Sequence, residues 1–381
     1  MVTWRRLLAT GVALTLTIGG APSAPAAAAA REPLRVTRHL GEQRLAHRLA
    51  YAGTVVGGLS GVDRDPATDT WYLISDDRWR YNPARFYTGR FAIDPTTGAF
   101  TGVTLTGVST LKRPDGTPYP AFGQPESADP ESIRFDPRTG RLLWSSEGDR
   151  PDPDHAAIPL ADGFVRWADR DGTHRGELPL PANLRLTTGE SGPRRNYGIE
   201  ALAIGRDRIA AAVEGPRYED GPQPTTLQGA NTRITVWSRW HGGYAQYAYP
   251  IDPLPAAPVP PTGVTDSGVS ELLAVDRHRY LALERSWIEG VNYRVKLYEV
   301  DLRRATNVAG RTSLAGGSGF RPAAKRLVLD LGAQALPVQN LESLAWGPRL
   351  PGGECTLVIG SDDNFDSREV TQFQAFAVRG C

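Results

Sequence analysis

A five-fold internal repeat constrains the fold of this chain more than any other feature of its sequence. Each repeat has a short apolar run, a turn rich in Asp, Gly or Pro, and a second apolar run that ends at an acidic residue. The repeats begin at positions 60, 131, 200, 271 and 342, which are 71, 69, 71 and 71 residues apart. Self-similarity at a nearly fixed period indicates a closed or stacked array of equivalent units.

Two further strand-like runs follow each of the first four hairpins. They cover 86–93 and 100–105, 164–168 and 176–180, 232–238 and 244–249, and 293–300 and 326–331. Four antiparallel strands per repeat around one axis are typical of a β-propeller blade. The 41 glycines and 31 prolines fit a chain that turns this often.

The fifth repeat contains only three strands before the chain ends at Cys381. A strand within Pro33–His47 is expected to supply the fourth and to close the ring, because closure removes a free sheet edge. We therefore predict an all-β fold, a single β-propeller of five four-stranded blades over residues 31–381. Six blades are the alternative if Arg31–Gly58 and the long inserts contain another sheet. The Pro-rich stretch Pro250–Pro261 falls between two repeats and is expected to be a surface loop.

The first thirty residues have the pattern of a secretory signal peptide. Arg5 and Arg6 precede an apolar stretch over Leu7–Gly20, and a run of small residues follows over Ala21–Ala30. The apolar stretch is too short to span a membrane. The paired arginines leave a twin-arginine signal open, although the general secretory route is our expectation. We predict a secreted, extracellular protein without a membrane span.

The chain has two cysteines, Cys355 and Cys381. An exported protein folds in an oxidising compartment, where paired cysteines form disulfides. Cys355 begins one apolar run and Cys381 follows the last one. If these runs form an antiparallel hairpin, the two sulfur atoms lie at the same end. We expect a Cys355–Cys381 disulfide that fastens the last strand; the alternative is two free thiols.

Acidic residues recur at the ends of the predicted inner strands. In a blade the first strand starts, and the second ends, on the same face, so these acids are expected around the mouth of the central channel. The inner ring would be Ser60, Glu131, Glu200, Glu271 and Glu342, and the outer ring Asp76, Asp77, Glu147, Asp149, Glu214, Glu284, Asp362 and Asp363. Converging carboxylates require protons, arginines or a metal, and hard oxygen ligands suit Ca²⁺. The alternative is that the repeated acids are architectural and accept N–H bonds from the next blade.

Arginines follow the outer acids at nearly constant offsets, as Arg78, Arg150, Arg217 and Arg285. The planar guanidinium binds phosphate or carboxylate in a bidentate manner, so these four are candidate substrate-binding residues. The alternative is that they only neutralise the acids.

Several classes of function are disfavoured. The 43 basic and 42 acidic residues nearly cancel, whereas a nucleic-acid binder needs a concentrated positive field. The six histidines form no zinc-binding motif, and no G-x-S-x-G, P-loop or dinucleotide-binding string is present. If the chain is a hydrolase, the most available chemistry is the attack of a metal-activated water on an ester that the metal and arginines hold.

The same segments carry a resemblance to a known family. Gly58-Leu59-Ser60-Gly61-Val62, Pro130-Glu131-Ser132-Ile133, Asn196-Tyr197-Gly198-Ile199-Glu200 and Asn340-Leu341-Glu342-Ser343-Leu344 resemble the bacterial phytase-like family, described as esterase-like activity of phytase. The resemblance covers about residues 55–380 and implies an exported propeller that hydrolyses phosphoesters or other esters. The calcium-dependent phytases are similar to six-bladed propellers with lysine-rich pockets, whereas this chain has five repeats and three lysines. Its inner ring looks more like the central calcium site of five-bladed calcium-activated nucleotidases.

We therefore predict a Ca²⁺-dependent hydrolase of phosphate esters that acts on a small-molecule or polymeric substrate as a monomer. The candidate catalytic residues are Glu131, Glu147, Glu200, Glu214, Glu271, Glu284 and Glu342. The candidate metal ligands are Ser60, Asp76, Asp77, Glu131, Glu200, Glu271, Glu342, Asp362 and Asp363. Two alternatives are a Ca²⁺-dependent carboxylesterase or lactonase, and a non-catalytic propeller that binds an envelope polymer or protein through Trp79, Tyr81, Trp240 and Tyr244.

Overall fold

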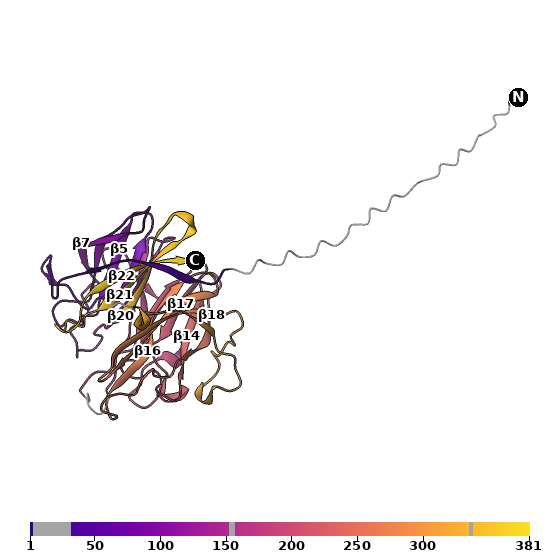
Figure 1. The fold of residues 1–381 in the computed structure, drawn as a ribbon. Coiled ribbons are helices and arrows are strands. Elements are labelled where there is room, and N and C mark those ends of the chain that lie inside the picture. Colours follow the sequence, from indigo (N-terminus) through magenta and orange to yellow (C-terminus); the bar gives the residue numbers. More distant parts are fainter. Residues whose placement is uncertain (3–31, 152–156, 335–337) are drawn as a thin grey trace. The chain divides into compact units, whose positions relative to one another are not determined.

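Five four-stranded antiparallel sheets account for nearly all the regular structure (Figure 1). The first two blades contain β4 (Gly61–Asp65), β5 (Thr70–Ser75), β6 (Arg85–Ile93) and β7 (Phe100–Thr110), and then β8 (Pro130–Asp136), β9 (Arg141–Ser146), β10 (Phe164–Ala168) and β11 (His174–Glu177). The next two contain β12 (Ile199–Ile204), β13 (Arg208–Val213), β14 (Ala230–Ser238) and β15 (Tyr244–Ile251), and then β16 (Thr265–Ala274), β17 (Arg279–Ile288), β18 (Asn292–Asp301) and β19 (Ala324–Asp330).

The fifth blade joins the two ends of the ring. Its strands are β20 (Asn340–Arg349), β21 (Cys355–Asp362), β22 (Gln372–Arg379) and the N-terminal strand β1 (Arg35–Arg44), which pairs with β22. In Figure 1 the indigo β1 accordingly runs beside the yellow strands. The prediction of five blades closed by an N-terminal strand is confirmed.

The structure, a computed structural model, describes residues 1–2, 32–151, 157–334 and 338–381. Residues 33–381 form one unit and residues 1–32 another. The expected signal peptide over residues 1–30 therefore lies almost wholly outside the described residues. Among the described residues, no helix combines the length and apolar character needed to cross a membrane. The helices are the 3₁₀ turns η1 (Ala182–Leu184), η2 (Tyr218–Asp220), η3 (Ala315–Gly317), η4 (Leu331–Ala333) and η5 (Pro351–Gly353), and a small hairpin joins β2 (Ala50–Tyr51) to β3 (Thr54–Val55).

The inner strands surround the axis in chain order. β4 packs against β8 and β20, and β12 packs against β8 and β16, so the innermost strand of every blade meets its two neighbours. Apolar side chains from adjacent blades form shared cores, as where Leu272 and Tyr280 of the fourth blade pack with Ile234 and Tyr249 of the third. Because each inner strand has the same direction, all five begin at one end of the ring.

Aspartates fix the first hairpin of several blades. Asp65 accepts hydrogen bonds from the amide of Ala67 (2.9 Å) and the hydroxyl of Thr68 (2.8 Å), and the Asp136 carboxylate makes the corresponding contacts in the second blade. Such side-chain-to-backbone bonds replace a backbone turn bond, which is why Asp recurs at this point of the repeat.

A disulfide links Cys355 to Cys381, with 6.4 Å between their Cα atoms. β21 and β22 form the expected antiparallel hairpin, in which Cys355 lies opposite Val378. The predicted pairing is confirmed, and it fastens the chain end to β21.

Candidate functional site

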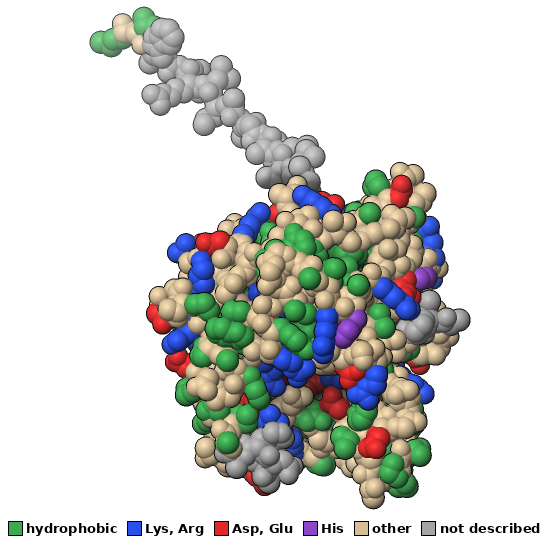
Figure 2. Space-filling model, turned by 90° about the vertical axis from the view of Figure 1, so that its left-hand side faces the viewer, with side chains coloured by type: hydrophobic (Ala, Val, Ile, Leu, Met, Phe, Trp, Pro, Cys, Tyr) green, Lys and Arg blue, Asp and Glu red, His purple; other side chains and the backbone are tan. Residues whose placement is uncertain are grey.

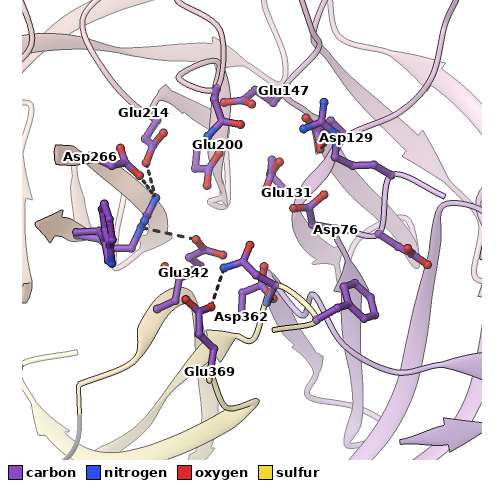
Figure 3. A pocket seen from close by; sticks show the side chains of 18 of the residues that line it. Asp76, Asp129, Glu131, Glu147, Glu200, Glu214, Asp266, Glu342, Asp362 and Glu369 are labelled. Atoms are coloured by element: carbon purple, nitrogen blue, oxygen red, sulfur yellow. Dashed lines mark hydrogen bonds and ion pairs between the residues drawn. The ribbon is translucent and has the colours of Figure 1, made fainter. Parts of the chain in front are cut away.

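A cavity of about 940 Å³ occupies the end of the ring at which the inner strands begin. Among the described residues, eleven aspartates and glutamates and four arginines line it, so the cavity has a large excess of carboxylates. Figure 2 shows a face with acidic side chains in a recess and basic side chains around it. In Figure 3 the labelled acids come from several blades and point toward one space.

Three of the predicted inner-ring glutamates line this cavity. They are Glu131, Glu200 and Glu342, and each is buried. Ser60 occupies the same place in the first blade, but its hydroxyl donates a hydrogen bond to the carbonyl of Glu131 (2.7 Å) and does not line the cavity. Its observed role is a link between the first and second blades.

Glu271 lies outside the cavity because the fourth blade is out of register by one residue. In the third and fifth blades the hairpin ladder skips Glu200 and Glu342 as bulged residues, whereas in the fourth blade it skips Ser270. A one-residue slip turns a strand side chain to the opposite face. The Glu271 carboxylate instead pairs with Arg134 at 2.6 Å and accepts a hydrogen bond from Ser132.

The same slip changes the outer ring. Asp362 is the last residue of β21, and Asp76, Glu147 and Glu214 directly follow the second strands β5, β9 and β13. All four residues line the cavity. In the fourth blade Arg285 takes this position, opposite Gly268 in the ladder. Glu284 lies one residue earlier and points away, where it accepts hydrogen bonds from Lys325 (2.7 Å) and Tyr249 (2.9 Å).

Two further predicted metal ligands support loops. The Asp77 carboxylate pairs with Arg85 and accepts hydrogen bonds from the amides of Tyr81 and Asn82 (2.8 Å each). Asp363 accepts hydrogen bonds from the amides of Gly58 (2.9 Å) and Phe365 (3.1 Å). These contacts orient the loops that border the cavity.

Of the four predicted anion-binding arginines, Arg78 and Arg285 line the cavity. Arg285 lies within 2.8 Å of Glu214, 3.1 Å of Asp266 and 3.6 Å of Glu342. Arg78 contacts Asp149 at 2.6 Å and Asp129 at 3.2 Å. These two arginines neutralise part of the acidic charge.

Arg150 and Arg217 do not line the cavity. Arg150 donates to the carbonyls of Ser191 and Pro193 (3.0 Å each). Arg217 pairs with Asp220 at 2.7 Å. Both hold loops in place.

Three acids of the cavity are not among the predicted site residues. Asp129 lies two residues before Glu131, Asp266 lies on an extension of β16, and Glu369 lies in the β21–β22 loop. Asp129 could have been found from its position, because Asn340 occupies the equivalent place before Glu342 and also lines the cavity. Asp266 and Glu369 have no counterpart in the repeat and gave no signal.

Burial and mutual repulsion raise the pKa values of eight of the cavity acids. Burial raises the pKa of Glu147 to about 8, with repulsion from Asp129 as the next cause. Burial likewise raises the pKa of Glu342 to about 7 and of Asp76 to about 6. The pKa values of Glu131, Glu200, Glu214, Asp129 and Asp362 lie well above their ordinary values for the same reason. Without a cation, carboxyl groups such as Glu147 therefore retain protons at neutral pH, and a bound cation would replace these protons.

The donor set fits a hard divalent cation. Oxygen atoms lie within 4.8 Å of one another in each of two triads, Asp76 with Asp129 and Glu131, and Glu147 with Glu200 and Glu214. In addition, Asp76 Oδ1, Asp266 Oδ1 and Asn340 Oδ1 are buried acceptors without a hydrogen-bond partner in the described part of the chain. Buried acceptors are normally satisfied, and several unsatisfied oxygens around one space match the ligand preference of Ca²⁺.

Backbone strain is concentrated at this cavity. Ten described residues other than glycine have a positive φ, and six of them line the cavity: Arg78, Trp79, Asn196, Asn292, Asn364 and Phe365. Such conformations cost energy and persist where the surroundings enforce them, often at functional sites. The loops after Asp76-Asp77 and Asp362-Asp363 share two consecutive residues of this kind, so the first and fifth blades present similar loops to the cavity.

The aromatic residues considered for polymer binding do not form one surface. Trp79 lines the acidic cavity. Trp240 and Tyr244 line a smaller cavity of about 410 Å³, formed by strand connections at the other end of the ring. Tyr81 packs against Phe365, with 4.8 Å between ring centroids.

The solved structures similar to this chain resemble it only weakly. An endo-arabinase from Bacteroides thetaiotaomicron is 10% identical, with a TM-score of 0.41, over 85% of this chain and 96% of the other. A periplasmic gluconolactonase from Pseudomonas aeruginosa is 14% identical, with a TM-score of 0.36, over 84% and 86%. At these values the likeness says nothing about the activity of this chain. No curated protein matches the sequence.

A family comparison gives a direct result. Residues 54–365 match the phytase-like family, described as esterase-like activity of phytase. The matched segment includes all the cavity acids described above except Glu369. This chain therefore belongs to the phytase-like family.

Proposed function

We propose that this protein is an exported, Ca²⁺-dependent hydrolase of phosphate esters whose active site is the acidic cavity. The observation that carries the proposal is the convergence of buried carboxylates with unsatisfied oxygen acceptors on one space. Membership of the phytase-like family supports ester hydrolysis as the reaction class. The disulfide supports an oxidising, extracellular location, as does the predicted signal peptide over residues 1–30.

The six residues of the two carboxylate triads would hold Ca²⁺: Asp76, Asp129, Glu131, Glu147, Glu200 and Glu214. A bound divalent cation supplies a Lewis acid and lowers the pKa of a coordinated water. Oxygen ligands from several blades would allow the six to eight bonds that Ca²⁺ takes.

Arginine and glutamate side chains supply the other functions in this proposal. Arg285 and Arg78 project into the same cavity and would bind the negatively charged oxygens of the ester. Glu342 lies 3.6 Å from Arg285, and burial raises its pKa to about 7. A carboxyl group with this pKa exchanges its proton readily at neutral pH, so Glu342 is our candidate for general acid–base catalysis.

Calorimetric titration of chelator-treated protein with Ca²⁺ tests the metal site. We expect saturable binding that weakens at least tenfold in Glu200→Gln, because this change removes a charged ligand from one triad. The matched control is Glu177→Gln, which alters a partly exposed glutamate on the outer strand β11. Absence of binding, or equal binding by Glu200→Gln and the wild type, would refute the metal site.

A substrate panel tests the reaction class. We expect hydrolysis of p-nitrophenyl phosphate or its diester in the presence of Ca²⁺ and its loss in EGTA. Turnover of p-nitrophenyl acetate alone would identify a carboxylesterase instead. Binding of Ca²⁺ with no turnover of any ester would indicate a binding protein.

A further inference from the structure

The fourth blade projects beyond the mouth of the propeller. Its strands β16, β17 and β18 each have ten residues, whereas β12 and β13 in the third blade have six. β16 begins at Thr265, five residues before Ser270. Ser270 is the bulged residue of this blade and corresponds to Glu200 and Glu342 in the third and fifth blades. The additional residues therefore form a wall on one side of the acidic cavity.

Three side chains form the upper row of this wall. Asp266 on β16 lies opposite Trp287 on β17, and Trp287 lies opposite Tyr293 on β18. The three residues therefore lie side by side across the sheet. Directly opposite residues of antiparallel strands share a face. All three line the cavity, as does Arg285, which lies two residues closer to the acidic floor on the same face.

Gly268 allows this wall to meet the acidic floor. A Cβ at Gly268, opposite Arg285, would lie 2.4 Å from Cγ of Glu214. The absence of a side chain brings Glu214 against the wall, where it pairs with Arg285. The wall is thus joined to the carboxylate triads through one ion pair.

Polar groups surround the two aromatic rings. The hydroxyl of Tyr293 donates a hydrogen bond to Glu369 Oε1 (2.8 Å), and the side-chain Nδ2 of Asn364 donates one to Glu369 Oε2 (2.8 Å). Asp266 Oδ1 is a buried acceptor that has no hydrogen-bond partner among the described residues, and the exposed residue Asn292 also borders the cavity. Flat apolar surface and hydrogen-bonding groups therefore occur together on the wall.

We infer that the fourth-blade wall binds the alcohol part of the substrate and that this alcohol is a hydroxylated ring, such as a sugar. A sugar ring has an apolar C–H face that packs on an aromatic side chain, while its hydroxyls need donors and acceptors at its edge. Trp287 and Tyr293 supply the aromatic surface, and Asp266, Asn292 and Glu369 surround it. The cavity volume of about 940 Å³ leaves room for such a group beside a phosphate. The inference rests on the proposed phosphate-ester hydrolysis.

The test compares three phosphate esters on the wild type and three variants. Glucose 1-phosphate carries a hydroxylated ring, glycerol 1-phosphate a linear polyol, and phenyl phosphate an aromatic ring. In Trp287→Ala we expect KM for glucose 1-phosphate to rise about tenfold, the effect of removing one stacked aromatic ring, with less than a twofold change for glycerol 1-phosphate. Tyr293→Phe retains the ring and is expected to have a smaller effect. Trp240→Ala is the matched control, since this tryptophan is 61% exposed at the other end of the propeller.

Calorimetric binding of glucose 1-phosphate in the presence of Ca²⁺ separates the two proposals. If no ester is hydrolysed but Trp287→Ala alone loses binding, the hydrolase proposal fails and the wall assignment stands. If hydrolysis occurs and Trp287→Ala affects glucose and glycerol phosphates equally, the wall assignment is refuted. Preference for phenyl phosphate would refute the hydroxylated ring, and absence of both binding and turnover would refute both proposals.

Discussion

Replacement of Arg134 by methionine should unfold this protein or bring it close to unfolding. The Arg134 side chain is buried on the axis and donates hydrogen bonds to the carbonyls of Val62 (2.8 Å), Leu202 (2.7 Å), Leu272 (2.7 Å) and Leu344 (2.7 Å). These four carbonyls lie on the inner strands of the four other blades. One guanidinium therefore connects all five blades, and it also pairs with Glu271.

The size of the effect follows from these contacts. An unsatisfied buried acceptor costs about 1–3 kcal/mol, and breaking a buried ion pair costs about 3–5 kcal/mol. These contributions overlap, because the same guanidinium serves both, so we expect Arg134→Met to lower the free energy of unfolding by about 4–8 kcal/mol. Folded domains are stable by only about 5–15 kcal/mol.

Urea unfolding followed by tryptophan fluorescence measures this effect. If Arg134→Met is too unstable to purify, the double variant Arg134→Met/Glu271→Leu keeps the test open, because it removes the stranded carboxylate and should recover about 2 kcal/mol or more. Arg303→Met is the control, since Arg303 is largely exposed and pairs with its neighbour Asp301, and we expect no change. A free energy of unfolding within about 1 kcal/mol of the wild type in Arg134→Met would refute the reasoning.

Three further predictions concern the disulfide, the acidic cavity and the buried carboxylate of Asp220. Replacing Cys355 and Cys381 by serine releases a loop between residues 26 apart; the entropic model gives a loss of about 3.5 kcal/mol, measurable as a lower urea midpoint, and an unchanged midpoint would contradict it. Gly268→Ala should weaken Ca²⁺ binding in calorimetry at least fivefold, because the added Cβ displaces Glu214, and unaltered affinity would show that Glu214 is not a ligand. Burial alone would raise the pKa of Asp220, but hydrogen bonds from Arg233 and Arg217 hold that pKa below its ordinary value of 3.8. The resulting stability is present above that pH and is lost as the pH falls through the lower folded pKa. The Tm difference between wild type and Asp220→Asn should therefore be largest near pH 7 and shrink below about pH 3.8, and a difference independent of pH would contradict this assignment.

The repeat determined much of the fold without the structure. A period near 71 residues, with turn residues at fixed places, predicted five blades, and the three-stranded last repeat predicted closure by the N-terminal strand. The first prediction succeeds because strand pairing within the first four blades is local in sequence. The second succeeds because a blade of three strands would leave a free sheet edge, which β1 covers. The outer strand of the second blade lies earlier in the chain than predicted. It covers His174–Glu177, whereas the prediction was 176–180. The predicted range contains Pro179, which has no N–H to donate to a neighbouring strand.

The position of the site was also predictable, but the full set of residues that line it was not. The topology of a blade places the start of the first strand and the end of the second on one face, so Glu131, Glu200 and Glu342 meet as expected. The sequence spacing suggested that Glu271 belongs with them. A bulge at Ser270 turns Glu271 toward the axis instead, and spacing alone cannot reveal a one-residue bulge.

The sequence by itself therefore determined the number of blades, the closure of the ring, the disulfide and the end of the propeller at which the acids gather. Only the tertiary structure decided which side chains share the cavity. It placed Arg285 among the acids, brought in Asp266 and Glu369 from outside the repeat, and assigned Glu271 to Arg134 on the axis. The physical reason is that the repeat fixes the path of the backbone, whereas the direction of each side chain depends on local register and on contacts between distant segments.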